Sequence, residues 1–280
     1  MENSSIISAF QGIVGKAYVL WEDEKLNTYK NSCIPETRSI QLALLPETVQ
    51  QVQEIVNLAG LFKLPLYPIS TGKNWGYGSA NPVRDNNVIL DLSRMQQIEV
   101  NKELAYAVIG PGVTQQQLFE HLNKNKTGLM MDPTGSGPYC SVLGNTLERG
   151  YGISPYGNHF ASLCGMEIVL PDGEVLKTGF GRYPQAKATH IFPYGMGPYL
   201  DGIFTQSNLG IVTKIAVWLM PVPEHFEACY FFSENEDDIG PLVEAARWLL
   251  LHGVVRGAIN LVHRNRSLTM LSQYPWEQMG

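Results

Sequence analysis

The fold is decided by the stretch Pro68-Ile-Ser-Thr-Gly-Lys-Asn-Trp-Gly-Tyr-Gly78, which follows the short apolar run of residues 64–67. The apolar run predicts a buried strand, so the stretch lies where this strand ends and a loop begins. The glycines Gly72, Gly76 and Gly78 permit positive φ and let a ligand approach the backbone without meeting a Cβ atom. The stretch therefore predicts a ligand-binding loop, with an ordinary glycine-rich turn as the alternative.

The polar groups of this loop favour an anion as the ligand. Ser70, Thr71 and Asn74 carry short hydrogen-bonding side chains, and the exposed amides of such a loop form a concavity suited to negative charge. A diphosphate is the best candidate. Neither usual nucleotide fingerprint is present, because the loop matches neither Gly-x-Gly-x-x-Gly before a helix nor a glycine followed four residues later by Gly-Lys-Ser/Thr.

Composition narrows the class of protein. The 280-residue chain is 44% hydrophobic and 16% charged, a globular balance with room for one large domain or two smaller ones. A net charge of −6 without a basic run argues against a nucleic-acid partner. The N-terminus is unlike a signal peptide, no apolar run reaches the length of a membrane span, and four distant cysteines suggest neither zinc nor a disulfide framework. We expect a cytoplasmic protein with no membrane partner.

The N-terminal part of the chain combines helix and strand patterns. Residues 1–30 have helical apolar spacing and predict a lead-in segment. A strand over residues 39–45, a helix capped by Thr48 and a strand beginning at Pro65 then form one βαβ unit. The two strands of this unit are expected to be parallel.

The following segments favour strands over helices. One helix is expected over residues 113–122, with Thr114 as its N-cap and Gln117 as the partner in a capping box. The turn at residues 171–174 predicts an antiparallel hairpin, and Pro221-Val-Pro223 predicts a domain boundary. Strands are expected at residues 86–92, 98–101, 105–112, 163–170, 175–178 and 214–220. Many short strands with few helices are typical of an α+β fold.

A second dense region spans residues 132–156. It combines five glycines with three prolines and small polar residues, and apolar and tyrosine side chains are interleaved among them. A surface linker has the same glycine content but little use for the apolar residues. We therefore expect a packed loop layer against a flat ligand.

Together these motifs resemble the FAD-binding PCMH-type flavoproteins of the vanillyl-alcohol oxidase and p-cresol methylhydroxylase (4-cresol dehydrogenase) family, most closely the branch that oxidises para-substituted phenols. The resemblance covers about residues 40–223, in the family's order. The motifs that carry it lie at residues 70–78, 110–114, 141–150, 156–157, 165–170, 192–202, 206–213 and 218–221.

The resemblance implies FAD as the cofactor and assigns residues to it. The positions expected to bind the FAD diphosphate are Ser70, Thr71, Gly72, Lys73 and Asn74. The positions expected around the ribityl chain and flavin are Pro111, Gly112, Ser141, Gly144 and Asn145. The positions expected near the adenine end or the flavin edge are Gly210, Ile211 and Val212.

The resemblance also implies a reaction. A phenolate would lose hydride from its para benzylic carbon to flavin N5, and the resulting quinone methide would take up water or lose a proton. Tyr77 matches a tyrosine that holds the substrate phenolate by donating a hydrogen bond, so it is the catalytic candidate. A stacking wall of the flavin pocket is its alternative role. The expected substrate is a small phenol or related alcohol.

One departure from the family concerns an acidic group. Members of the oxidase kind place an aspartate near flavin N5, and alignment without gaps puts Ser136 at that position. Either the loop shifts to bring Asp132 there or the acidic group is absent, and we favour its absence. His159 has no matched role in the family, and we assign it a structural one.

A second departure is length, because the family's members run to roughly twice this size. We divide the chain into a helical lead-in (1–39), an FAD-binding PCMH-type domain of two subdomains (40–223) and the start of a ferredoxin-like cap domain (224–280). The expected cap elements are a strand at residues 228–233, a helix at 239–251 and a strand at 257–262. The family's covalent flavin attachment residue and its other phenolate-binding groups normally come later, so neither is carried over.

Different functions remain open on this evidence. The chain is an FAD-dependent oxidoreductase, alone or completed by a second polypeptide, or it is an inactive FAD-binding module. A homo-oligomer and an enzyme acting on a sugar or other alcohol are further alternatives. The electron acceptor is not indicated by any motif.

Overall fold

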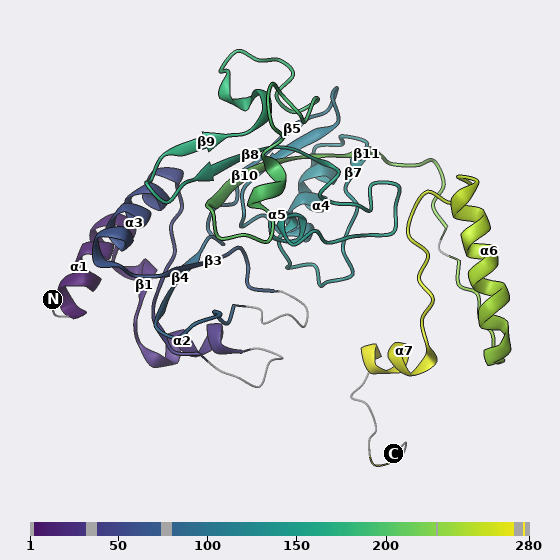
Figure 1. Ribbon diagram of the computed structural model, residues 1–280, viewed down its shortest axis with the longest axis horizontal. Helices are drawn as coiled ribbons and strands as arrows, with labels where there is room; N and C mark the ends of the chain where they lie inside the picture. The colour runs from purple at the N-terminus through teal and green to yellow at the C-terminus, as the bar shows by residue number, and fades with distance from the viewer. Residues whose placement is uncertain (1–2, 32–37, 74–79, 228, 272–276, 278–280) are drawn as a thin grey trace.

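Two β-sheets form the body of the protein (Figure 1). The computed structural model describes residues 3–31, 38–73, 80–227, 229–271 and 277. One sheet has four strands in the order β1-β2-β4-β3, and the other has five in the order β5-β6-β10-β8-β9. The expected α+β fold with two subdomains is confirmed.

The four-stranded sheet carries the glycine-rich loop. Its strands are β1 (Val19–Leu20), β2 (Ile40–Leu44), β3 (Leu66–Ile69) and β4 (Asn87–Asp91). The strands β2 and β3 both run parallel to β4, which lies between them. The parallel orientation predicted for the βαβ unit is therefore right, although its two strands are not neighbours. The connecting helix α3 (Val49–Phe62) begins as predicted, because the Thr48 side chain accepts a hydrogen bond from the Gln51 amide.

Both faces of this sheet are covered, as the alternation of its apolar residues requires. Val88 and Leu90 of β4 pack in one cluster with residues of α3 and of α1 (Asn3–Val14). Ile89, between them, packs on the other face with Leu26 of α2 (Asp23–Lys30). The helical lead-in is therefore part of the packed body, and β1 is an element that the apolar spacing did not indicate.

The five-stranded sheet is antiparallel throughout. Its strands are β5 (Ile98–Asn101), β6 (Tyr106–Ile109), β8 (Leu163–Val169), β9 (Val175–Lys177) and β10 (Ile211–Trp218). The predicted hairpin is the β8–β9 pair. The helices α4 (Gln115–Lys124) and α5 (Val142–Leu147) contribute Leu118, Leu122 and Leu143 to the core beneath the sheet. The strands β7 (Leu129–Met130) and β11 (Met220–Pro221) form a separate short pair.

The two sheets share a core where they meet. Val169 of β8 and Ile211 of β10 belong to the same buried cluster as Leu44 of β2 and Val52 of α3. The loops that follow β3, β6 and β7 are thereby held by a packed frame. These are the loops in which the sequence predicts the binding site.

The C-terminal elements lie to one side of the sheets (Figure 1). They include α6 (Ile239–Leu251), which has the predicted bounds, and α7 (Arg264–Leu271). The strands expected at residues 228–233 and 257–262 are wrong, because the described residues of both segments are irregular and pair with no strand. Strands need a ladder partner to satisfy their backbone groups, and the described chain offers none here.

Short 3-10 helices complete the described structure. They are η1 (Lys16–Tyr18), η2 (Gly179–Arg182), η3 (Asp201–Phe204) and η4 (Glu236–Asp238). Within the described residues, every helix is too short or too polar to cross a membrane.

Candidate cofactor-binding site

The first component of the site is the loop that begins directly after β3. Gly72 has φ of +63°, the left-handed conformation for which the sequence supplies a glycine. Ser70 and Thr71 are half-buried, and no described residue pairs with their hydroxyl groups or accepts from the backbone amides of residues 70–73. A half-buried loop with unpaired donors suits an anion, so these residues fit a diphosphate.

The second component is the first turn of α5. The Ser141 hydroxyl accepts from the Gly144 amide at 2.9 Å, which caps the helix, and it donates to the Pro111 carbonyl at 2.7 Å. A Cβ atom on Gly144 would lie 2.3 Å from the Ser70 hydroxyl oxygen. Glycine at this position therefore lets α5 approach the loop after β3. The structure brings together Ser70, Pro111 and the turn at Ser141 and Gly144, which come from three separate parts of the sequence.

Two close contacts, at Gly112 and at Ser136, join further loops to this site. A Cβ atom on Gly112 would lie 2.2 Å from the Ser93 carbonyl oxygen, so the close packing of two backbones requires glycine here. The Ser136 hydroxyl reaches the Lys73 carbonyl oxygen at 3.5 Å. The loop that contains Ser136 thus lies beside the loop after β3.

The remaining predicted positions lie elsewhere or are not described. Ile211 and Val212 begin β10, and their side chains are buried in two different core clusters. Both residues pair with β8, and no described contact joins them to the loop after β3. Asn74 and the catalytic candidate Tyr77 lie outside the described residues.

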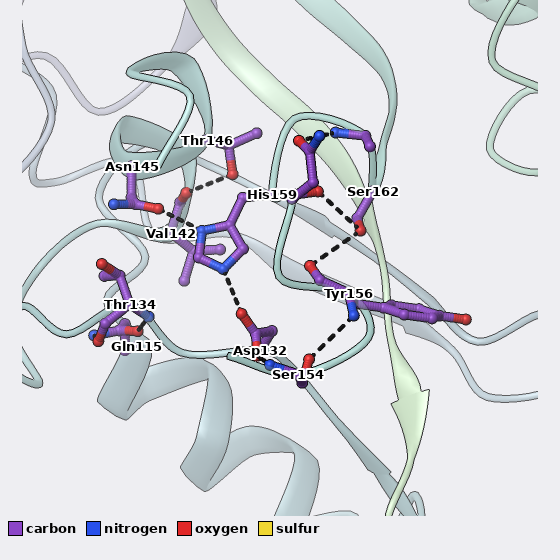
Figure 2. A network of polar contacts seen from close by, with 12 residues as sticks. Gln115, Asp132, Thr134, Val142, Asn145, Thr146, Ser154, Tyr156, His159 and Ser162 are labelled. Carbon is purple, nitrogen blue, oxygen red and sulfur yellow. Dashed lines mark hydrogen bonds and ion pairs between the residues drawn. The ribbon is translucent and has the colours of Figure 1, made fainter. Parts of the chain in front are cut away.

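A charged network lies next to α5 (Figure 2). His159 Nε2 is 2.8 Å from Asp132 Oδ2, and His159 Nδ1 is 2.5 Å from Asn145 Oδ1. The second oxygen of Asp132 accepts the backbone amide of Ser154 at 2.9 Å. The network therefore ties the loop after β7, helix α5 and the loop before β8 together.

The hydrogen bonds of this network hold the Asp132 side chain in place. Its side chain is 2% exposed and both of its oxygens are committed, to His159 and to Ser154. Burial alone would raise the pKa of Asp132, but the hydrogen bonds from His159 and Ser154 outweigh it and hold the pKa below its ordinary value. Asp132 is therefore ionised, and both of its oxygens accept hydrogen bonds from the protein. Whether it or no acidic group lies near the flavin stays a prediction.

Glycines surround this network because side chains would collide with it. A Cβ atom on Gly152 would lie 1.6 Å from Asp132 Oδ2, and one on Gly150 would lie 2.2 Å from both amide atoms of Asn145. The glycines of the second dense region thus allow the loop to close over polar side chains. Gly150 and Gly152 of the second dense region face protein groups, whereas a Cβ atom on Gly135 or Gly137 would meet nothing within 4 Å. The predicted packing of this region against a flat ligand stays a prediction.

Two cavities adjoin the network. A cavity of about 30 Å³, enough for a water molecule, is bounded in part by Asp132, Asn145 and His159. A wider cavity of about 660 Å³ lies between the loop at residues 149–160 and residues 256–258. Phe160 and Arg149 contribute to its wall.

The contacts of His159 were not predicted from the sequence. Its partners Asp132 and Asn145 lie 27 and 14 positions away, in the loop after β7 and in the short helix α5, neither of which was predicted from periodicity. The one available signal is the coincidence of a histidine, an aspartate and an amide within a single glycine-rich region. Such a coincidence identifies the residues but not their pairing.

Comparison with known proteins agrees with this geometry. Residues 40–179 match the sequence model of a family described as "FAD binding domain". The protein is therefore a flavoprotein by class, with FAD as its cofactor. More narrowly, the chain belongs to the FAD-binding PCMH-type flavoproteins of the vanillyl-alcohol oxidase and p-cresol methylhydroxylase family.

Two curated relatives extend along nearly the whole chain. The chain is 41% identical over 97% of its length to the 1'-carboxy-chondrochloren decarboxylase of Chondromyces crocatus. It is 38% identical over 92% of its length to the flavoprotein subunit of the hydroxylating 4-cresol dehydrogenase of Pseudomonas putida. It covers 50% of each relative, so it spans about half the length of these proteins.

Solved structures give the same result. A crystal structure of p-cresol methylhydroxylase with substrate bound matches with a TM-score of 0.86 at 38% identity, over 91% of this chain and 50% of that one. The 4-ethylphenol oxidase of Gulosibacter chungangensis, in an isoeugenol complex, matches with a TM-score of 0.81 at 37% identity, over 88% and 48%. The PCMH-type fold expected from the sequence is confirmed.

Proposed function

We propose that this chain is the FAD-binding part of an oxidoreductase that removes hydride from a para-substituted phenol. The observation that carries the proposal is the 38% identity to the flavoprotein subunit of 4-cresol dehydrogenase over 92% of the chain. The match to the substrate-bound p-cresol methylhydroxylase, at a TM-score of 0.86, supports the same substrate class. Because the relatives are about twice as long, turnover is proposed together with a region equivalent to their second half.

The proposed FAD contacts combine backbone amides and short side chains. The diphosphate is held by the unpaired amides and hydroxyls of residues 70–73, together with Asn74. Ser141, Gly144 and Asn145 of the α5 turn, with Pro111 and Gly112, surround the ribityl chain and flavin. The backbone of Gly210, Ile211 and Val212 contributes at the adenine end or the flavin edge. FAD, when bound, supplies the acceptor for the hydride.

Tyr77 is the proposed catalytic residue of this chain. Its phenol donates a hydrogen bond to the substrate phenolate, which keeps the substrate electron-rich and lowers the barrier to loss of hydride. The cavity of about 660 Å³ beside the loop at residues 149–160 offers room for a small aromatic molecule. Phe160 and Tyr151 supply aromatic surface there, and Arg149 and Arg256 supply positive charge that favours a phenolate.

The proposed partner is a polypeptide that covers the C-terminal elements. No residue of α6 is buried, and its Ile239, Trp248 and Leu251 are 64%, 53% and 69% exposed. Phe231 and Phe232 are 89% and 92% exposed. An apolar surface of this kind marks an interaction site. A second copy of the chain is the alternative occupant, and light scattering of the purified chain distinguishes a monomer from a homo-oligomer.

Two earlier expectations stay predictions. The domain boundaries after residues 39 and 223 are tested by limited proteolysis, which should cut first near them. The cytoplasmic location is tested by cell fractionation.

Anaerobic reduction tests the proposed reaction. FAD-loaded chain, alone or mixed with the second half of a relative, is exposed to 4-ethylphenol and separately to an aliphatic alcohol and a sugar. We expect 4-ethylphenol, and neither the alcohol nor the sugar, to abolish the visible absorbance of the flavin. Tyr77→Phe should slow this reduction. Reduction by the alcohol or sugar instead would overturn the phenol assignment. Bound FAD that no substrate reduces would identify an inactive module.

A further inference from the structure

The wide cavity of about 660 Å³ carries an excess of positive charge. Arg149 and Arg256 line it, and none of the other described residues around it is a carboxylate. The chain as a whole has a net charge of −6, so a cavity lined by positive charge alone contrasts with its composition. A concave surface concentrates the field of such charges and attracts anions. The cavity therefore favours a ligand with negative charge.

The guanidinium of Arg149 is held beside an aromatic wall. It donates to the Thr205 hydroxyl from Nε at 3.1 Å and from Nη2 at 2.9 Å. Its central carbon lies 5.7 Å from the centre of the Phe160 ring, which also lines the cavity. A fixed positive charge next to an aromatic side chain suits the ring of a phenol. Arg149 and Phe160 thus form an end of the cavity that fits the aromatic part of a substrate.

The guanidinium of Arg256 is not held in this way. The residue is exposed, and within the described part of the chain it has no hydrogen-bond or ion-pair partner. Its five N–H donors form a planar, permanently charged fork. Such a fork matches a carboxylate, which accepts two parallel hydrogen bonds from it. Arg256 therefore offers a complete set of donors to a ligand.

The backbone next to Arg256 is packed against the opposite side of the cavity. A Cβ atom on Gly257 would lie 1.8 Å from the Ile153 carbonyl oxygen, so this approach of two backbones requires glycine. Gly257 and Ala258 line the cavity together with Arg256. The segment at residues 256–258 is therefore a wall of the cavity, and its contact with the loop at residues 149–160 sets the position of the Arg256 backbone.

We propose that Arg256 is a specificity-determining residue that binds a carboxylate on the substrate. The inference rests on the proposed function, which uses this cavity for a para-substituted phenol. A single phenolate needs one cationic partner, and Arg149 beside Phe160 supplies it at the aromatic end. Arg256 then binds a second negative group, so the substrate class is a phenol whose para substituent ends in a carboxylate. A cavity of about 660 Å³ has room for such a molecule.

A matched pair of ligands tests the proposal on the purified chain. The compound 3-(4-hydroxyphenyl)propanoate is 4-ethylphenol with a carboxylate added at the end of the ethyl group. Isothermal titration calorimetry, with and without FAD, gives the dissociation constant of each ligand. Because the charged pair involves an exposed side chain, we expect the carboxylate to bind roughly three- to tenfold more tightly than 4-ethylphenol. Arg256→Gln should abolish this preference and leave the dissociation constant of 4-ethylphenol unchanged.

Further variants separate the fork of Arg256 from charge in general. Arg256→Lys keeps the charge but lacks the planar fork, so it should retain only part of the preference. Arg247→Gln is the matched control, because Arg247 lies on α6, pairs with Glu244 at 2.6 Å and does not line the cavity. Equal binding of the two ligands by the wild-type chain would overturn the proposal. A preference for the carboxylate that survives Arg256→Gln would overturn it as well.

The binding test and flavin reduction have independent outcomes. If the preference for the carboxylate depends on Arg256 and no phenol reduces the bound FAD, the proposed reaction fails and the carboxylate site stands. If 4-ethylphenol reduces the flavin and the carboxylate binds no more tightly than 4-ethylphenol, the carboxylate site fails and the proposed reaction stands.

Discussion

Substitution of Gly152 by alanine examines the packing of the loop layer directly. The new Cβ atom would lie 1.6 Å from Asp132 Oδ2 and 2.7 Å from the Pro133 carbonyl oxygen. Gly152 does not have positive φ, so alanine is allowed by its backbone conformation and the collision is the whole effect. Asp132 must move, and it then loses its hydrogen bonds to His159 and to the Ser154 amide.

The cost follows from the burial of Asp132. Its side chain is 2% exposed, so a displaced carboxylate leaves two buried partners unsatisfied. Depriving a buried charge of its partners costs about 3–5 kcal/mol, and because the Asp132 side chain can relax in part we expect a loss near the lower figure, about 3 kcal/mol. For a chain of this size such a loss lowers Tm by roughly 6–12 °C.

Urea and thermal unfolding measure this loss. Gly135→Ala is the matched control, because a Cβ atom there has no neighbour within 4 Å and the residue lies in the same loop layer. In an Asp132→Ala background the collision with the carboxylate is removed, so Gly152→Ala should lower the free energy of unfolding by less than half as much. An equal cost in both backgrounds, or a loss at Gly135 as large as at Gly152, would refute the reasoning.

Acid should lower the free energy of unfolding more in the wild-type chain than in the Asp132→Asn variant. The pKa of Asp132 is lower in the folded chain than in the unfolded chain, where it is about 4. The stabilisation by Asp132 is therefore complete above the unfolded pKa and is lost as pH falls through the folded pKa. Urea unfolding at several acidic pH values measures the difference. Gly112→Ala should lower the free energy of unfolding by about 2–3 kcal/mol, because its Cβ atom would lie 2.2 Å from the Ser93 carbonyl oxygen, a backbone atom that cannot rotate away. A Tm that equals the wild-type value within error would contradict this. Thr114→Ala should lower the free energy of unfolding by about 1 kcal/mol, because it removes the N-cap side chain of α4. Gln117→Ala should lower it by no more than that.

Local signals predicted the starts of α3, α4 and α6 and most strands. The capping box of Thr114 and Gln117 is formed as expected, because such a motif needs only residues three positions apart. The Thr48 cap and the hairpin of β8 and β9 are local in the same way. By contrast, the position of β4 between β2 and β3 depends on pairing across the chain, which no local pattern records.

The candidate site was predicted as a set of loops but not as a set of contacts. Residues 70–73 were identified because glycine and hydroxyl residues follow a predicted strand, and Ser141 was identified from the resemblance to the family. The pairing of His159 with Asp132 depends on how two loops fold over α5, and loop geometry is not encoded in periodicity. The strand expected at residues 257–262 failed for a related reason, since an apolar run becomes a strand only where a partner strand is available.

The central claim is that the loops at residues 70–73, 111–114 and 141–145 hold FAD. Titration of the purified, folded chain with FAD, followed by flavin fluorescence, tests it most directly, with Ser70→Ala/Thr71→Ala as the variant and His225→Gln as the control. We expect saturable FAD binding, which the Ser70→Ala/Thr71→Ala substitution weakens and the His225→Gln substitution leaves unchanged. A folded wild-type chain that leaves FAD fluorescence unchanged, or binding that the double substitution does not affect, would contradict it.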